Sequence, residues 1–201
     1  MLSSADWYLH GHVLRSLFSH RSGKLFQSPE ICNYGQEKFR RTNTYDAYCG
    51  DPKVKGRVMT VQYAIHSYGA GAAHPNCHFE TFSFVLEPLT QISSLEEIFV
   101  NPSEALTLIQ AAVRAKLLTK SADDSGVDTF GLDKDWVERG TETWSDLGAF
   151  MFSETEIDFL FAPYQVSSYA NGSQFAEVQY EAIVHLIRSE FKSALGIEHL
   201  S

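Results

Sequence analysis

The sequence has no continuous run of apolar residues long enough to cross a membrane. A membrane-spanning helix needs roughly 18–20 such residues, and residues 1–10 also lack the uninterrupted apolar stretch of a secretory signal. We therefore expect no transmembrane segment and no signal peptide in this chain. On the residues alone, the protein is either cytosolic or a part of a longer exported one.

Positive charge is scarce beyond residue 60. Residues 61–201 contain seven Lys and Arg against twenty Asp and Glu, a net charge of −13, whereas residues 1–60 contain nine against five, a net charge of +4. Proteins that bind nucleic acid usually have a dense basic face, so we expect no nucleic-acid partner. An acidic surface favours a basic protein partner through complementary potentials. A solvated acidic surface without a docking role explains the same charge.

Cysteine is also rare. The three cysteines are Cys32, Cys49 and Cys77, and the first two flank a polar, turn-rich segment. A disulfide between Cys32 and Cys49 would remove loop entropy worth roughly 3 kcal/mol in the chain-entropy model. An odd number of cysteines leaves one thiol unpaired in any scheme with one bridge. Three reduced cysteines fit the sequence equally well, and both readings stay open.

The common motifs of catalysis and nucleotide binding are missing. The chain contains no Gly-x-Ser-x-Gly, no Walker loop, no Gly-x-Gly-x-x-Gly and no Cys-x-x-Cys. Together these absences favour a binding domain over an enzyme, and we expect no cofactor and no catalytic residues.

One group of residues offers an alternative with metal chemistry. His74, His78 and Glu80 follow His66 at a spacing that suits a predicted hairpin, and imidazole and carboxylate are suitable zinc ligands. The spacing differs from the His-Glu-x-x-His of helical zinc proteases. A polar rim of a hairpin accounts for the same residues, and we favour that interpretation.

The apolar residues predict an α+β fold. Hydrophobic residues make up 44% of the chain, enough for a packed core. Their spacing predicts helices over about 6–18, from Pro102 onward and over 181–195, and strands over 57–68 and 77–87. Residues 19–52 are expected to be irregular. We expect an antiparallel sheet with helices packed on one face, a 1–56 segment with an N-terminal helix and the cysteine-containing stretch, and a 57–201 domain.

The C-terminal third predicts a strand, a turn and a second strand, followed by a helix. Ile157, Phe159 and Phe161 alternate toward one face, and Val178 and Tyr180 do so after the turn. Pro163 ends the first strand because it has no amide hydrogen. Asn171-Gly172 supplies the positive backbone angle that a tight return needs.

Tyrosines are frequent around this turn. An exposed tyrosine combines a large contact area with a hydroxyl, and its ring also stacks on sugars. Our candidate binding residues lie at this turn and at the turn around residue 74, and they are Tyr68, His74, Tyr164, Tyr169 and Asn171. Half-buried corner residues whose hydroxyls satisfy nearby backbone groups are the alternative interpretation.

Three parts of the sequence resemble a known family. Phe161-Ala-Pro-Tyr-Gln-Val-Ser-Ser-Tyr-Ala-Asn-Gly172, followed by Val178-Gln-Tyr180, is similar to the signature of the DUF3298 family, the RsiV-type C-terminal domain. Tyr68-Gly-Ala-Gly-Ala-Ala-His74-Pro-Asn76 resembles the turn of that family, and Leu95-Glu-Glu-Ile-Phe99 a later segment. The resemblance covers roughly residues 57–195. Ser167-Ser168 stands where the family usually has Ala-Pro, and Gln179 where it often has Ile-Pro.

The resemblance implies an α+β domain on the outer side of a bacterial membrane, often paired with a DUF4163 or PdaC-like N-terminal part. In that family the domain occurs in anti-sigma factors that bind lysozyme and beside deacetylase domains that act on peptidoglycan. It implies a non-catalytic, extracytoplasmic recognition domain, periplasmic or secreted, with a lysozyme-like protein or peptidoglycan as partner. The alternative function is a metal-assisted hydrolase of cell-wall glycan that uses His66, His74, His78 and Glu80.

Overall fold

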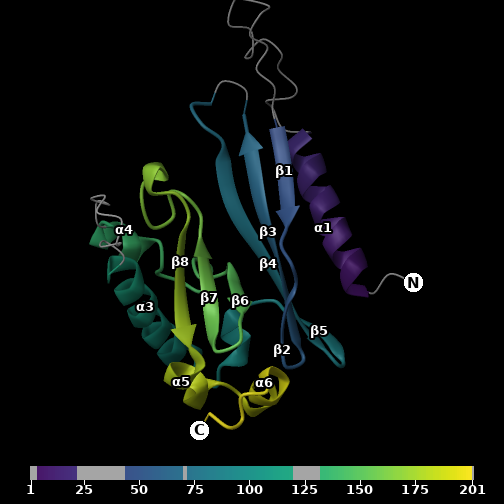
Figure 1. Cartoon of the computed structure of the whole chain (residues 1–201), viewed down its shortest axis with the longest axis vertical. Coiled ribbons are helices and arrows are strands. Elements are labelled where there is room, and N and C mark those ends of the chain that lie inside the picture. The colour runs from purple at the N-terminus through teal and green to yellow at the C-terminus, as the bar shows by residue number, and fades with distance from the viewer. Residues whose placement is uncertain (1–3, 22–43, 70–71, 120–131, 201) are drawn as a thin grey trace, which may run out of the picture. The chain divides into compact units, whose positions relative to one another are not determined.

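The computed structural model describes residues 4–21, 44–69, 72–119 and 132–200 (Figure 1). The chain forms two compact units. The first comprises Met1–Tyr48 and Ala64–Cys77, and the second comprises Cys49–Tyr63 and His78–Ser201. Each unit includes residues from both sides of position 56, and the predicted domain boundary there stays a prediction.

The first unit contains the N-terminal helix and the distal part of a β-hairpin. Helix α1 spans Ser4–Arg21, which confirms the helix predicted over residues 6–18. Strand β1, Thr44–Cys49, lies in the stretch that was expected to be irregular, so that expectation is wrong for these six residues. Only Tyr45 and Ala47 are half-buried and the other four residues are exposed, so the alternation is short and weak, and the strand is recognised by its pairing with β3.

The two long predicted strands are β3, Val58–Tyr68, and β4, Asn76–Leu86, and both are confirmed. The sheet has the order β1-β3-β4-β5, with β5 at Leu89–Ile92, and β2 at Lys53–Lys55 also pairs with β3. Gly56 makes the turn between β2 and β3 with a φ of 58°. A Cβ atom at Gly56 would lie 2.4 Å from the carbonyl oxygen of Ala194, so this position needs glycine both for its angle and for space.

A second, three-stranded antiparallel sheet forms the centre of the second unit. It has the order β6-β7-β8, with β6 at Phe150–Phe152, β7 at Glu156–Phe161 and β8 at Gln174–Gln179. Ile157 pairs with Val178 and Phe159 with Ala176. Ile157, Phe159 and Phe161 are fully buried, so the predicted strands and their inward face are confirmed.

Helix α3, Pro102–Thr119, packs on β8. It begins where the sequence predicts, with proline at the first helical position. The Asn101 side chain accepts a hydrogen bond from the Glu104 amide at 3.4 Å and donates one to the Glu104 carboxylate at 3.1 Å. The buried stripe recurs every four residues, at Ala105, Ile109, Val113 and Leu117.

The single helix predicted over residues 181–195 is wrong. The chain instead forms α5 at Tyr180–Ile183, a 3-10 turn η5 at Val184–Leu186, and α6 at Ser189–Leu195. The backbone between them is held by the last residue of the 3-10 turn η3, Leu95–Ile98, and by Val100 just after it. The amide of Val100 donates to Leu186, and the amide of Arg188 donates to Ile98, both at 2.8 Å. This pairing draws Ile187 into an extended conformation and interrupts the helix.

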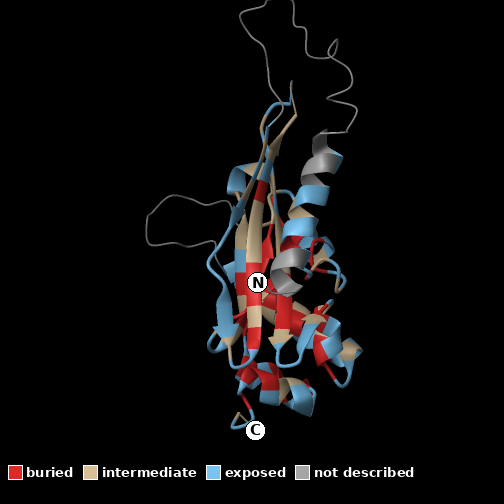
Figure 2. Ribbon diagram, turned by 90° about the vertical axis from the view of Figure 1, so that its right-hand side faces the viewer, coloured by how far each residue is buried: buried red, intermediate tan, exposed pale blue. Residues whose placement is uncertain are grey.

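The core of the second unit lies between the three-stranded sheet, α3 and the C-terminal helices. Figure 2 shows buried residues in red along the strands and in the C-terminal helical segment. Antiparallel sheets with helices packed on them confirm the α+β class. Across the described ranges, no helix combines the length and the apolar character needed to cross a membrane.

Candidate functional site

The turn that leaves β7 places Tyr164 in an unusual backbone conformation. The amide of Gln165 donates to the carbonyl of Ala162 at 3.1 Å, which closes a four-residue turn with Pro163 at its second position and Tyr164 at its third. Tyr164 has a φ of 72°. Glycine or asparagine usually occupies such a position, and a bulky residue there is strained. Strained residues persist where their surroundings hold them, and they gather at functional sites.

The neighbouring helix α4, Lys134–Arg139, holds this turn in place. Asp133 caps α4 by accepting a hydrogen bond from the Trp136 amide at 2.9 Å. The indole nitrogen of Trp136 then donates to the carbonyl of Tyr164 at 3.0 Å. A helix cap therefore positions the tryptophan that fixes the strained residue.

Gln165 and Gly140 make the second anchor of the turn. The amide nitrogen of the Gln165 side chain donates to the carbonyls of Gly140 at 3.2 Å and Asp146 at 2.7 Å. The backbone of Gly140 lies so close that a Cβ atom there would be 2.1 Å from the carbonyl oxygen of Gln165. Val166, the next residue, is fully buried. The turn is thus held from both sides while the Tyr164 ring stays outside.

The Tyr164 side chain lies beside Tyr169 at the surface. Tyr164 is 51% exposed, and the two ring centroids are 5.6 Å apart with planes tilted by 35°. Tyr169 begins the 3-10 turn η4, Tyr169–Asn171, and Gly172 ends it with a φ of 66°. The positive angle predicted at Gly172 is therefore present. We call Tyr164, Tyr169 and Asn171 the tyrosine corner.

The structure brings three of the five predicted binding residues together in the tyrosine corner. Asn171 is exposed, and its carbonyl accepts a hydrogen bond from the Gln174 side chain at 2.7 Å. Tyr68 and His74 belong to the first unit. The Tyr68 hydroxyl donates to the carbonyl of Ala72 at 3.1 Å, and Nδ1 of His74 lies 3.1 Å from the carbonyl of Pro75.

The alternative metal ligands do not form a metal site. Within the ranges that the structure describes, no three His, Cys, Asp or Glu side chains are grouped so that they could hold a metal ion. His78 and Glu80 are two residues apart on β4, with Nε2 and Oε1 3.6 Å apart. Nε2 of His66 lies 3.9 Å from Sγ of Cys77, and its ring meets Tyr48 edge-on at 5.8 Å.

The predicted disulfide between Cys32 and Cys49 involves a residue outside the described ranges, because Cys32 falls within residues 22–43. Cys49 is exposed, and its thiol donates to the carbonyl of Gly50 at 3.4 Å. The pairing stays a prediction.

Lys53, Ser153 and Asp158 form a polar cluster between β2 and the β6–β7 hairpin. The Lys53 ammonium donates to the Ser153 hydroxyl at 2.9 Å and to the Asp158 carboxylate at 2.8 Å, and Ser153 donates to Asp158. Lys53 and Asp158 therefore form an ion pair across the two elements, and the Ser153 hydroxyl is hydrogen-bonded to both. Lys55 and Glu154 pair across the same two elements at 2.9 Å. We interpret the cluster as a connection between the two sheets of the second unit.

Sequence reasoning missed the residues that support the tyrosine corner, namely Trp136, Gly140 and Gln165. Asp133 three residues before Trp136 is a helix-start signal that could have revealed α4. The close approach of Gly140 to Gln165 joins segments 25 residues apart, and no local pattern reports it.

Comparisons with known proteins agree with this fold. The family model described as "Protein of unknown function (DUF3298)" matches residues 96–181, which include α3, α4 and the tyrosine corner. A search of the curated proteins found no match.

Solved structures of two DUF3298 proteins resemble this chain. A member from Bacteroides fragilis has 14% sequence identity and a TM-score of 0.63, over 98% of this chain and 74% of that one. A DUF3298 protein from Pseudomonas aeruginosa PAO1 has 13% identity and a TM-score of 0.52, over 73% of this chain and 62% of that one. At these identities the likeness concerns the fold.

Proposed function

Because residues 96–181 of this chain match the DUF3298 family, we propose that the protein is a non-catalytic recognition domain of a bacterial envelope protein. The tyrosine corner is its contact surface, and it acts outside the cytoplasm, in the periplasm or after secretion. The observation that carries the proposal is the strained, half-exposed Tyr164 beside Tyr169. Tyr164 is held in a costly conformation by Trp136 while its ring faces solvent, which is the expected arrangement of a rigid contact residue.

A basic, lysozyme-like protein is the partner that the charge favours. Residues 61–201 contain seven basic and twenty acidic residues, a net charge of −13. Complementary charge speeds the encounter of two proteins, and a pair of rigid tyrosines supplies the central contact.

The test is binding of a basic lysozyme to the wild type and to Tyr164→Ala and Tyr169→Ala. An aromatic hot-spot residue contributes about 2 kcal/mol or more, so each change should weaken binding by roughly thirtyfold or more. Tyr48→Ala is the matched control, because Tyr48 is 62% exposed and lies in the other unit. Equal affinity for all four proteins, or no binding by the wild type, would refute this partner.

Peptidoglycan is a second candidate, which the paired rings favour because tyrosine stacks on sugars. Sedimentation with insoluble peptidoglycan distinguishes it from the protein partner. Retention that depends on Tyr164 and is insensitive to salt supports the glycan, whereas lysozyme binding that weakens as salt increases supports the protein.

The metal-assisted hydrolase, the alternative of another class, has no grouped set of ligands among the described residues, and the zinc content of the protein tests it. Protein purified without an affinity metal should contain less than stoichiometric zinc if the recognition proposal holds. One zinc per chain, lost in a His74→Ala or His78→Ala variant, would favour the hydrolase instead.

A further inference from the structure

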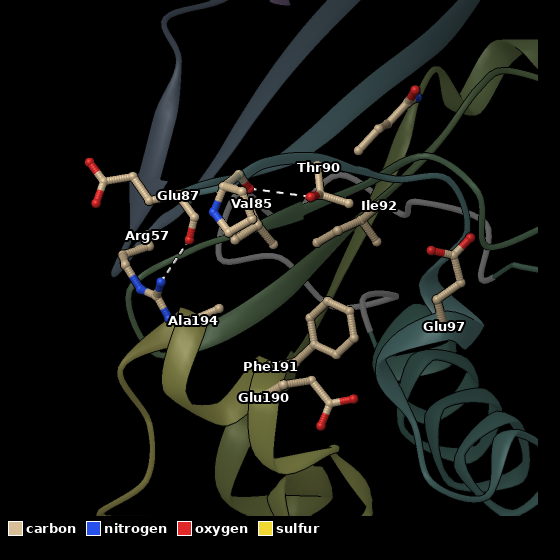
Figure 3. A pocket seen from close by; sticks show the side chains of 11 residues that line it. Arg57, Val85, Glu87, Thr90, Ile92, Glu97, Glu190, Phe191 and Ala194 are labelled. Carbon is tan, nitrogen blue, oxygen red and sulfur yellow. Dashed lines mark hydrogen bonds between the residues drawn. The ribbon is translucent and has the colours of Figure 1, made fainter.

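A cavity of about 300 Å³ opens between the β4–β5 hairpin and α6, all within the second unit (Figure 3). Its apolar surface comes from Val85, Ile92, Phe191 and Ala194. Ile92 is 4% and Ala194 is 3% exposed, and Val85 and Phe191 pack against the core from the cavity side. The walls are therefore part of the packed interior, and the cavity is supported by the fold.

The two ends of the cavity differ in charge. Glu97 of η3 and Glu190 of α6, both exposed, lie on the side of the Phe191 ring, and Arg57 and Glu87 lie together at the opposite end (Figure 3). The Arg57 guanidinium donates to the carbonyl of Glu87 at 2.9 Å. Glu190 accepts a hydrogen bond from Ser189 at 3.4 Å. Among the described residues, no Lys, Arg or His forms a salt bridge with Glu97 or Glu190.

An apolar surface that ends in two carboxylates without a cationic partner matches one kind of ligand, an unbranched alkyl chain that ends in a cation. Lysine has this form, with a compact ammonium on a flexible four-carbon stem. The volume is at the lower limit of small-molecule pockets, which suits one side chain better than a whole metabolite.

We propose that this cavity binds a lysine side chain of a partner polypeptide. The methylene groups lie on Phe191, Ile92 and Val85, and the ammonium lies between Glu97 and Glu190. The site is separate from the tyrosine corner and does not depend on the function proposed for it.

The experiment uses three peptides of the form acetyl-Gly-Xaa-Gly-amide, in which Xaa is lysine, norleucine or glutamate. Norleucine keeps the alkyl stem and removes the ammonium. We expect the lysine peptide to shift the methyl NMR signals of Val85 and Ile92 saturably, and to bind the whole chain about fivefold more tightly than the norleucine peptide. The difference should shrink as salt is raised.

Paired variants assign the difference to the carboxylates. In the double variant with Glu97→Gln and Glu190→Gln, the lysine peptide should bind no more tightly than the norleucine peptide. Glu96→Gln with Glu181→Gln removes the same charge from exposed residues that do not line the cavity, and should keep the preference. Unchanged signals of Trp136 show that each variant is folded.

Four results would overturn the proposal. Tighter binding of the glutamate peptide would assign the cavity to an anion at Arg57. Equal binding of the lysine and norleucine peptides by the wild type would overturn it, and so would a lysine preference that survives the double change Glu97→Gln and Glu190→Gln. Absence of any saturable shift with the lysine peptide would overturn it as well.

Discussion

Gly140 lies against the backbone of the turn that carries Tyr164. We expect Gly140→Ala to lower the free energy of unfolding by about 1–3 kcal/mol, because its Cβ would be 2.1 Å from the carbonyl oxygen of Gln165 and 2.9 Å from Cγ1 of Val166. Urea unfolding at neutral pH measures the loss. Gly11→Ala is the control, since Gly11 lies in helix α1 with no atom within 4 Å of the added methyl group. That variant should be as stable as the wild type or more stable. Equal stability of Gly140→Ala and the wild type would contradict the close approach.

Ser167, three residues after Tyr164, carries the one buried side-chain oxygen without a hydrogen-bond partner among the described residues. The residue is 3% exposed. A buried hydroxyl that loses water without gaining a partner costs about 1–3 kcal/mol. We therefore expect Ser167→Ala to raise the free energy of unfolding by about 1 kcal/mol, measured by urea unfolding.

Ser168→Ala is the matched comparison for Ser167→Ala, because Ser168 is the adjacent serine and is only half-buried. That variant should change stability by less than about 0.5 kcal/mol. A decrease in stability for Ser167→Ala would mean that the hydroxyl has a partner after all, such as a bound water.

At the scale of elements, α3 binds the second sheet through residues four apart. Ile109 is fully buried under β8, whereas its neighbour Leu108 is 39% exposed. Ile109→Ala should lower the free energy of unfolding by about 2–5 kcal/mol, because it removes buried methyl groups and leaves a cavity. Leu108→Ala should cost less than about 1 kcal/mol. Chemical unfolding of both variants checks the assignment, and similar losses would mean that α3 does not present this face to the sheet.

The same helix shows which elements the sequence could predict. Pro102 and the four-residue apolar spacing mark α3 without any tertiary information, and alternation marks β7 in the same way. The break between α5 and α6 could not be predicted, because Ile183 and Leu195 keep helical spacing while backbone pairing with residues 98–100 interrupts the helix. The sequence did not predict strand β1 because most of its residues are exposed, and an exposed edge strand has little apolar alternation.

Across the whole molecule, the sequence predicted the exposed groups of the candidate site better than their support. The candidate residues Tyr164, Tyr169 and Asn171 could be predicted because they lie close together in the sequence, just before Gly172. The strain at Tyr164 was not, because proline followed by a tyrosine gives no signal of a positive φ. The Tyr164 conformation is supported by Trp136, which is 28 residues earlier in the sequence and donates a hydrogen bond to the Tyr164 carbonyl.

Stability of the whole protein should fall at alkaline pH through two tyrosines, the buried Tyr180 and the half-buried Tyr63. Burial, and secondarily the nearby carboxylates of Asp158 and Glu154, raise the pKa of Tyr180 above its usual value of 10.0. Burial, followed by interaction with Cys49, raises the pKa of Tyr63 to about 12. Below pH 10 the folded and unfolded states both keep these protons, so stability is independent of them. Above pH 10 the unfolded state loses the protons first, and the free energy of unfolding falls as pH rises toward the folded pKa values.

Tyr180→Phe isolates the larger of these two shifts. At pH 7 the variant should lose about 1 kcal/mol, because the Tyr180 hydroxyl donates to the carbonyl of Ser153 at 3.0 Å. Between pH 10 and 11.5 its stability should fall less steeply than that of the wild type, by up to about 1.4 kcal/mol per pH unit, since one linked proton is gone. Urea unfolding across this range gives both values. Tyr48→Phe removes a hydroxyl from an exposed side chain and should leave the stability at pH 7 unchanged. Parallel curves for Tyr180→Phe and the wild type would show that the Tyr180 proton is not linked to folding, and that its burial against the β6–β7 hairpin is lost in solution.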